Sequence, residues 1–271
     1  MAKTLRPIRP NAGVRVMYGK DITRLLKAMS KDLEDIIFRT YSKQEHKFLP
    51  QVAQDAAPVP ALTSEISKAM KRWMRRWDIA AQRIAENFVK SIDKHSLKAL
   101  ESELKRAGFT VKLDKSFRSN TMIQALIKAN VALIKSIPEQ YQTDLYGIVM
   151  RGITDGVGAQ DIKKEIHGRY VKSEKRALFI ARDQTNKATE TIKRERDMEL
   201  GITRAIWIHV PGLKTSRASH KKMNGKEFIL AEGCYDEAEK RKVHTGELPG
   251  CQCTYLSLIH ISEPTRHAQI S

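Results

Sequence analysis

The sequence predicts a mainly α-helical chain, in which a helical N-terminal region is followed by a smaller α+β C-terminal domain. Two observations carry this prediction. Through most of residues 20–200, apolar side chains recur at intervals of three and four, which is the period of one buried face of a helix. Over 204–230, aromatic and β-branched residues instead form short runs separated by Gly and Asn, as is typical of strands joined by turns.

The helices are expected in a fixed order. An irregular basic arm over 1–19 comes first, because arginines there alternate with prolines. The apolar period then predicts helices over 20–48, 63–92, 95–107, 118–136, 139–154, 159–167 and 173–200. Pro138 and the Gly-rich segment 152–158 are expected to separate neighbouring helices, and Gly201 is expected to end the last one in a left-handed conformation.

Strands and domains follow from the same pattern. Short strands are expected where β-branched and aromatic residues gather, over 109–113, 204–210 and 227–230. A connector rich in Ala and Pro is expected over 50–60. The predicted organisation is therefore a basic arm over 1–19, a helical region over 20–150 and a C-terminal domain over 151–255.

Residues 256–271 are expected to be foreign to the natural protein. Their first part reads Leu-Ser-Leu-Ile-His-Ile-Ser-Glu-Pro-Thr-Arg, which matches the translation of a transposase-type sequencing adapter, and the residues after it fit that adapter's continuation. No function is therefore expected of His260 or His267.

The charge of the chain points to an anionic partner. Lys and Arg number 49 against 31 Asp and Glu, which gives a net charge of +18 and a pI of about 9.8. A chain this basic usually meets a polyanion, because Lys and Arg near phosphates release condensed counterions. The alternative is a basic surface that serves only solubility or assembly. The sequence therefore indicates contact with DNA and leaves that alternative open.

The cysteine count and the hydropathy indicate where in the cell the protein is expected. Three cysteines in 271 residues do not make a disulfide framework, so a reducing cytoplasm is expected. No apolar stretch reaches the length that spans a membrane, and residues 1–19 lack the apolar core of a signal peptide. No membrane partner is therefore expected.

The helix over 63–92 is the best candidate for contact with nucleic acid. Its basic side chains are spread widely enough to follow a phosphate track, and they are Lys68, Lys71, Arg72, Arg75, Arg76 and Arg83. Trp73 and Trp77 could stack on bases, but their spacing matches the apolar stripe and favours the core. In either case the Lys and Arg side presents a positive surface.

A group of cysteines and histidines is the candidate metal site. Thiolate sulfur and imidazole nitrogen are the ligands that zinc prefers, and any four of five residues would complete a tetrahedron: His220, Cys234, His244, Cys251 and Cys253. Cysteines one residue apart point to opposite faces of a strand, so both bind one ion only at a turn, which Pro249-Gly250 can form. The alternative is a set of buried or inert cysteines and surface histidines.

Two catalytic interpretations have less support in the sequence than the candidate metal site. A nucleophile pair could join Cys251 or Cys253 to a histidine, but no orienting third group or oxyanion loop stands at a recognisable spacing. A metal-dependent nuclease could use the acidic residues before His167, which are Asp155, Asp161 and Glu165. Acidic residues at the start of a helix usually cap it instead. The sequence therefore predicts a protein that is not an enzyme.

Four short signatures follow one another in the last third of the chain. They are Ile180-Ala-Arg-Asp-Gln-Thr-Asn186, Gly201-Ile202 leading to Trp207, Ser216-Arg-Ala-Ser-His220 with Asn224-Gly225-Lys226, and Leu248-Pro-Gly-Cys-Gln-Cys-Thr-Tyr255. In this order they resemble the head-morphogenesis domain of tailed bacteriophages, the Mu F-like family of minor head proteins, over residues 150–255. The chain departs from the family's pattern at Leu213-Lys-Thr-Ser-Arg217, where many relatives have an acidic residue, and at His244-Thr-Gly, where many have His-Pro-Gly.

The first signature has two interpretations. Its polar residues could bind a partner or nucleic acid, or they could fix the helix against the small sheet, with Arg182 and Asp183 bridging to backbone groups. The second interpretation is favoured, because polar groups at such seams usually fix geometry.

The resemblance implies a minor head protein of the virion. Such a protein associates with the portal protein at the portal vertex, enters the procapsid with capsid and scaffold proteins in the host cytoplasm, and takes part in DNA packaging or ejection. Some relatives bind DNA without sequence preference, which the net charge of +18 suits. The alternative is a metal-dependent DNA-processing or toxin-like enzyme built on the same domain. Zinc is the one cofactor that the residues suggest.

Overall fold

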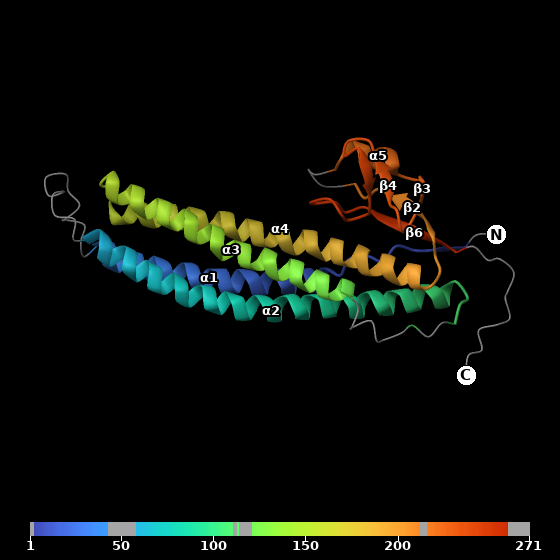
Figure 1. The fold of residues 1–271 in the computed structure, drawn as a ribbon, viewed down its shortest axis with the longest axis horizontal. Coiled ribbons are helices and arrows are strands. Elements are labelled where there is room, and N and C mark those ends of the chain that lie inside the picture. Colours follow the sequence, from blue (N-terminus) through green and yellow to red (C-terminus); the bar gives the residue numbers. More distant parts are fainter. Residues whose placement is uncertain (1–2, 43–57, 111–112, 114–120, 212–215, 260–271) are drawn as a thin grey trace. The chain divides into compact units, whose positions relative to one another are not determined.

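A computed structural model describes residues 3–42, 58–110, 113, 121–211 and 216–259 of the chain. It confirms a mainly α-helical fold with a small C-terminal region of antiparallel strands (Figure 1). The chain forms two compact units, each built from separate stretches. The helical unit comprises Val16–Phe88 and Gln124–Ala181, and the mixed unit comprises Met1–Arg15, Val89–Ile123 and Arg182–Ser271.

Four long helices account for most of the chain. They are α1 (Ala12–Ser42), α2 (Pro58–Arg106), α3 (Thr121–Thr154) and α4 (Ala159–Glu199). Three expected interruptions are absent from them: α2 runs through the gap between 92 and 95, α3 runs through Pro138, and α4 runs through 168–172. Of the Gly-rich segment 152–158, only the part between α3 and α4 breaks the helix.

Helix α3 continues through Pro138, although a proline was expected to end the helix there. A proline inside a helix removes one hydrogen bond and clashes with the carbonyl four residues earlier, at a cost of about 3 kcal/mol. In α3 three large side chains around Pro138 are fully buried, with Ile134 and Tyr141 at 0% exposure and Ile137 at 1%. Burying large side chains is worth roughly 1.5–3 kcal/mol each, which offsets the proline.

In the helical unit, side-chain contacts set the helix directions. Tyr18 stacks on Phe88 with ring centroids 4.0 Å apart, and Trp77 Nε1 donates to Met29 Sδ at 3.2 Å, so α1 and α2 are antiparallel. Tyr18 also donates to Asn130 Oδ1 at 2.9 Å, which joins α1 to α3. Trp73 and Trp77 are buried, so they belong to the core stripe and are not available to stack on bases.

The mixed unit holds a four-stranded antiparallel sheet in the order β1-β6-β2-β3. Its strands are β1 (Lys3–Leu5), β6 (Thr254–Ile259), β2 (Arg204–Ile208) and β3 (Glu227–Ile229). The predicted strands at 204–210 and 227–230 are therefore present and paired with each other. The arm over 1–19 differs from the irregular segment expected, because it contributes β1 and the start of α1.

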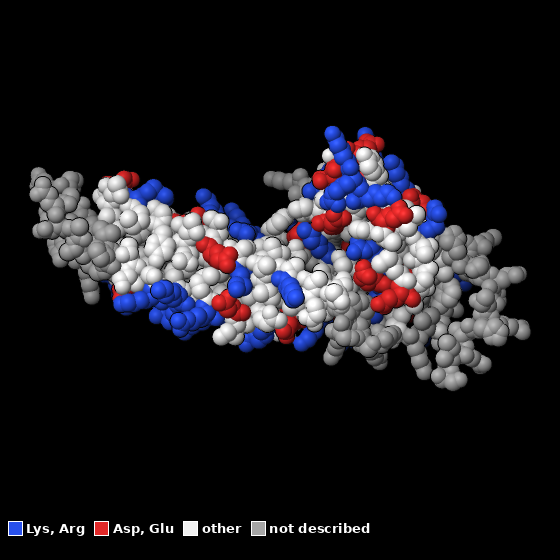
Figure 2. Space-filling model, in the orientation of Figure 1, with Lys and Arg blue, Asp and Glu red and all other residues white. Residues whose placement is uncertain are grey.

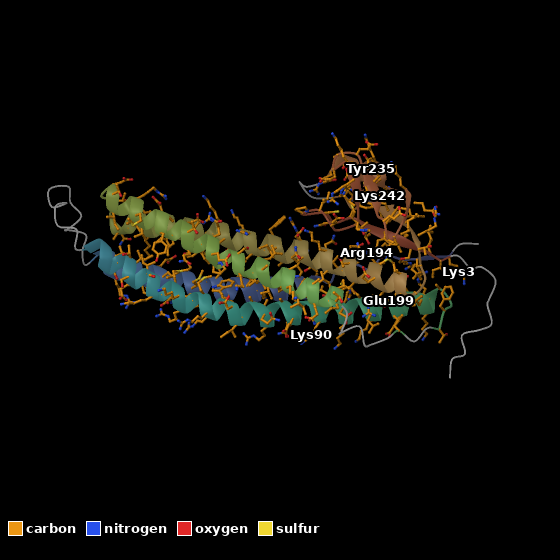
Figure 3. All side chains as sticks on the ribbon, in the orientation of Figure 1. Lys3, Lys90, Arg194, Glu199, Tyr235 and Lys242 are labelled. Carbon is orange, nitrogen blue, oxygen red and sulfur yellow. The ribbon has the colours of Figure 1, made fainter. Side chains whose placement is uncertain are left out.

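A second, two-stranded sheet joins β4 (Cys234–Asp236) to β5 (Arg241–Val243). Tyr235 and Lys242 face each other across it (Figure 3). The short helix α5 (Ala218–Met223) lies between β2 and β3 in sequence. These short elements lie over an apolar core that includes Trp207, Phe228 and Tyr255.

Several sequence expectations fall partly outside the described residues, among them the end of the expected helix over 20–48 and the start of that over 118–136. Of the predicted strand over 109–113, only 109, 110 and 113 are described, and none of them is in a strand. The predicted connector over 50–60 is described only from residue 58, where α2 has already begun. Of the stretch expected to be foreign, 256–259 complete β6, which a strand permits because its pairing is made by the backbone. Among the described residues, no helix is long and apolar enough to cross a membrane.

Candidate functional site

The Pro-Gly-Cys-x-Cys loop before β6 is fastened to helix α4 by buried polar side chains. Asp183 Oδ1 accepts a hydrogen bond from the Gly250 amide at 2.5 Å, and Asn186 Nδ2 donates to the Cys251 carbonyl at 2.7 Å. Gly250 has φ 72°, a left-handed conformation that a side chain would strain. Two buried hydrogen bonds, Asp183 to Gly250 and Asn186 to Cys251, therefore join the first signature to the last, and this pair is called the clasp. Asp183 bonds to a backbone group, as expected if the first signature fixes the helix against the sheet.

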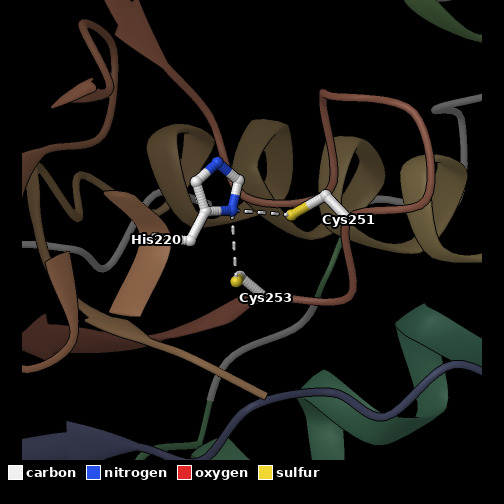
Figure 4. Close-up of side chains that lie close together, drawn as sticks. All are labelled: His220, Cys251 and Cys253. Carbon is white, nitrogen blue, oxygen red and sulfur yellow. Dashed lines mark hydrogen bonds between the residues drawn. The ribbon is translucent and has the colours of Figure 1, made fainter. Parts of the chain in front are cut away.

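The clasp brings a histidine and two cysteines together (Figure 4). Cys251 Sγ lies 3.4 Å and Cys253 Sγ 3.5 Å from the same atom, His220 Nδ1. The three ligand atoms all lie within 4.8 Å of one another, and all three residues are buried. The cavity beside them has a volume of about 20 Å³. The group is thus compact, with room beside it for a water molecule.

A second histidine lies at the same group. His209 Nδ1 stands 3.5 Å from Cys253 Sγ, and its Nε2 lies 3.1 Å from Ser216 Oγ. His209 follows β2, whose last pair with β6 is Ile208 with Thr254, and one further step along that register puts His209 opposite Cys253. His209 was not among the ligands predicted from the sequence. The Trp207-x-His209 alternation at the end of a predicted strand was the available signal.

His220 is held from two sides. Its ring meets Trp207 edge-on, with centroids 5.3 Å apart and planes at 79°. Its Nε2 lies 3.1 Å from Asp236 Oδ2, an ion-pair distance, although the two are not aligned as a hydrogen bond. Burial raises the pKa of Asp236, but hydrogen bonds from the Ala238 amide and Ser219 outweigh it and lower that pKa overall. A carboxylate therefore stands behind the imidazole.

The two thiols differ in their titration. The pKa of Cys251 is lowered to about 4, first by its hydrogen bond with Cys253 and also by His220, against the effect of burial. The pKa of Cys253 is raised, by the same bond to Cys251 and by burial. The pKa of His209 is lowered, chiefly by burial and then by the charge of Lys221. This set favours a thiolate at Cys251 and a neutral imidazole at His209.

Two of the five predicted metal ligands lie elsewhere. Cys234 is buried in the apolar core of the mixed unit, on β4. His244 follows β5 and is half-buried, and burial followed by the charge of Arg194 lowers its pKa to about 4. The structure thus brings His220, Cys251 and Cys253 together and leaves Cys234 and His244 outside that group.

Two of the three acidic residues of the nuclease interpretation, Asp161 and Glu165, take part in ion pairs. Asp161 contacts Lys164 at 2.8 Å, and Glu165 contacts Arg151 at 3.5 Å. Among the described residues, the one group of His, Cys, Asp and Glu with ligand atoms close enough to share an ion is His220, Cys251 and Cys253. The helix opening near Asp161 therefore offers no metal cluster in the described part of the chain.

The basic side chains predicted to contact nucleic acid are all exposed on α2. Figure 2 shows Lys and Arg gathered along the lower left of the view, over the first part of this helix. Arg72 pairs with Asp32 at 2.8 Å, and the Arg76 guanidinium lies over the Trp73 ring at 4.9 Å. Lys68 pairs with Glu65 at 2.9 Å. These contacts hold part of the face in place while leaving it positive.

A second basic feature lies in the mixed unit. A cavity of about 720 Å³ is lined in part by four arginines: Arg6, Arg9, Arg15 and Arg182. Helix α1 begins at its edge, where Asn11 Oδ1 accepts from the Val14 amide at 3.1 Å. None of the described lining residues is acidic. Four guanidinium groups and the positive end of a helix suit an anionic ligand.

Residues 144–256 match the family model described as Phage Mu protein F like protein. The chain is also similar to an uncharacterised protein of Haemophilus influenzae, with 25% identity over 270 residues. The aligned region covers 97% of this chain and 57% of that relative, so the chain spans little more than half of the relative's length. No solved structure matches the chain.

Proposed function

We propose that this chain, whose residues 144–256 match the Phage Mu protein F like family, is a minor head protein that acts at the portal vertex of a tailed bacteriophage. The family match indicates a phage head-morphogenesis protein. The finer role is assembly of the procapsid beside the portal, capsid and scaffold proteins, followed by DNA packaging or ejection. The single observation that carries the proposal is the family match over the segment that contains the clasp.

The build of the mixed unit supports a docking role. Its loop and helix are joined by buried hydrogen bonds, so the unit presents a surface of fixed shape. A further bond runs from Arg217 Nη2 to the Pro249 carbonyl at 3.2 Å. A rigid module of this kind binds a partner without first losing conformational entropy.

Contact with DNA is the second part of the proposal. The net charge of +18, the basic face of α2 and the arginine-lined cavity each support it. Phosphates bind to such surfaces through counterion release, which does not depend on base sequence. No base-reading element is proposed.

A thiol enzyme is the second candidate, because Cys251 Sγ lies 3.4 Å from His220 Nδ1 and Asp236 Oδ2 lies 3.1 Å from His220 Nε2. A nucleophile needs a substrate beside it, however, and Cys251 and His220 are 4% and 2% exposed. The adjoining cavity of about 20 Å³ holds a water molecule and no substrate. A metal-dependent DNA-processing enzyme is the other alternative, and turnover of plasmid DNA with a divalent ion, abolished by His220→Ala, would favour it over a structural protein.

The experiment is co-purification with the portal protein of the same phage. The full chain is expressed together with the portal protein, and portal rings are isolated at physiological salt. We expect the chain to remain on the rings, and to remain when nuclease has removed DNA. Bare rings would contradict the proposal, as would retention equal to that of an unrelated protein of similar charge.

A further inference from the structure

We propose that His220, Cys251 and Cys253 bind one structural zinc ion that fastens the mixed unit, and that His209, which lies beside Cys253, becomes the fourth ligand when the ion binds. The proposal rests on the side-chain geometry of these residues and not on the family, so it can fail while the portal proposal holds.

The spacing of the ligand atoms is the first argument. In a tetrahedral site with Zn–S near 2.3 Å and Zn–N near 2.0–2.1 Å, neighbouring sulfur and nitrogen ligands stand about 3.5 Å apart. The observed separations are 3.4 Å from Cys251 Sγ to His220 Nδ1, 3.5 Å from Cys253 Sγ to the same atom, and 3.5 Å from Cys253 Sγ to His209 Nδ1. The first two separations thus agree with one tetrahedron, and the third places His209 beside its Cys253 corner.

Hydrogen bonding alone explains this group less well. A neutral imidazole nitrogen has one lone pair, yet both sulfurs lie at His220 Nδ1. Cys253 Sγ in turn lies at two imidazole nitrogens. An ion shared by His220 Nδ1 and the two sulfurs, with His209 beside Cys253 as the fourth ligand, accounts for these contacts.

The groups behind the histidines support the same conclusion. Histidines that bind a metal usually present their other nitrogen to a carboxylate or another acceptor, which fixes the ring. Asp236 Oδ2 stands 3.1 Å from His220 Nε2, and Ser216 Oγ lies 3.1 Å from His209 Nε2. Both rings therefore turn Nδ1 toward the sulfurs.

The backbone supplies the turn that the Cys-x-Cys spacing requires. The Cys251 amide donates to the Leu248 carbonyl at 2.9 Å, and Gly250 adopts a left-handed φ of 72°. Because the loop curves here, both sulfurs reach one side, which two cysteines on a straight strand could not do.

Four protein ligands make a closed site, which is typical of structural and not catalytic zinc. The ion would join the end of β2, helix α5 and the loop before β6. The strands β3, β4 and β5 have three residues each, so they offer little core of their own. A metal that joins such short elements would add to the stability of this part of the mixed unit.

The test is metal analysis of the full chain, purified under reducing conditions without chelator. We expect one zinc per chain, and visible absorption of tetrahedral thiolate-bound cobalt after exchange with Co²⁺. Removal of the ion by a chelator should lower the melting temperature, and adding zinc back should restore it. A metal-free protein whose melting temperature is unchanged by chelator and by zinc would overturn the proposal.

Variants identify the ligands. Cys251→Ser and Cys253→Ser should lose the ion, and His209→Asn should bind it at least tenfold more weakly in chelator competition. Asp236→Asn should weaken affinity about 10- to 100-fold, as removal of such supporting groups does. The matched controls Cys234→Ser and His244→Asn should keep one zinc. Equal loss in Cys234→Ser, or full affinity in Cys253→Ser, would contradict the assignment.

Circular dichroism separates ligand loss from misfolding. The variants and the chelated wild type should share the long-helix signal, because α1 to α3 lie apart from the ligands in sequence. A Cys251–Cys253 disulfide found by mass analysis in the freshly lysed protein would also overturn the proposal, because oxidised cysteines cannot bind the ion.

Discussion

At the scale of single residues, buried polar side chains define the mixed unit. Asp183 is 7% exposed and holds the Gly250 amide, while Lys187 Nζ lies 3.1 Å from its other oxygen. Lys193 and Asp197, 3.2 Å apart, are both buried nearby. The sequence showed that these positions are polar on a helix. Their partners in the loop and sheet, such as Gly250 for Asp183 and Ser257 for Lys193, lie more than sixty positions away, which no local pattern reveals.

The clasp gives the first prediction. Asp183→Ala should lower the free energy of unfolding by about 2 kcal/mol, because the buried Gly250 amide loses its acceptor. Guanidinium unfolding measures the change. Glu199→Ala, an exposed change on the same helix, should stay within about 0.5 kcal/mol of wild type. Equal effects of the two substitutions would show that the clasp contributes little.

Glu190 gives a prediction for pH. Burial raises its pKa from 4.5 to about 7, against the charge of Lys193 and a hydrogen bond from Thr245, while Cys251 adds to the rise. In the unfolded chain Glu190 ionises near 4.5, so unfolding releases its proton between these values. The contribution of Glu190 to stability therefore falls as pH rises from 4.5 to 7.

Glu190→Gln should remove this dependence. Relative to the variant, the wild type should lose roughly 3 kcal/mol of unfolding free energy across that window, at about 1.4 kcal/mol per unit of pKa. Chemical denaturation of both proteins at several pH values measures the difference. Parallel pH profiles of the two proteins would show that the pKa of Glu190 is not raised by folding.

At the scale of elements, the sequence predicted the helices but divided them too often. The type and order of the helices were predictable because the apolar period is strong, and β2 and β3 were predicted because β-branched and aromatic residues gather there. Breaks at Pro138 and near residues 93 and 170 were wrong. At Pro138 the burial of Ile134, Ile137 and Tyr141 sustains the helix. Strands β1, β4 and β5 have three residues each, which is too short for alternation to show.

The proline in α3 gives a prediction at this scale. Pro138→Ala should stabilise the protein by about 1–2 kcal/mol, since the restored amide can bond within the helix and the steric clash is removed. Part of the gain is offset by the greater freedom of the unfolded chain. Thermal unfolding measures the change. A lower melting temperature would mean that the helix is shaped around the proline.

The basic face of α2 gives a prediction about DNA binding. Replacing Lys71, Arg75 and Arg83 with Gln should reduce the slope of log affinity for DNA against log salt by about 2–3, because each phosphate that a basic side chain neutralises adds about 0.9 to that slope. Titration of labelled duplex DNA at several salt concentrations measures the slope. The control, which removes the same amount of charge, replaces exposed lysines on other helices: Lys128, Lys172 and Lys175. Equal slopes would place the DNA-binding surface elsewhere, with the arginine-lined cavity as the next surface to test.

At the scale of the whole molecule, each compact unit is built from stretches that are separate in the sequence. Helices α2 and α4 each contribute to both units, and the N-terminal strand β1 pairs with β6 near the other end of the described chain. The sequence suggested an arm and successive domains, because periodicity reports neighbours along the chain and not the long-range pairing of β1 with β6. The metal group shows the same limit, since His209 joins it only through the register of β2 and β6.

The most direct test of the central claim is quantification of this polypeptide in particles of the source phage. Mass spectrometry of purified procapsids and virions should find it at a few copies per portal ring, in both particles. Absence from both, with normal amounts of portal and capsid protein, would contradict a role as a minor head protein.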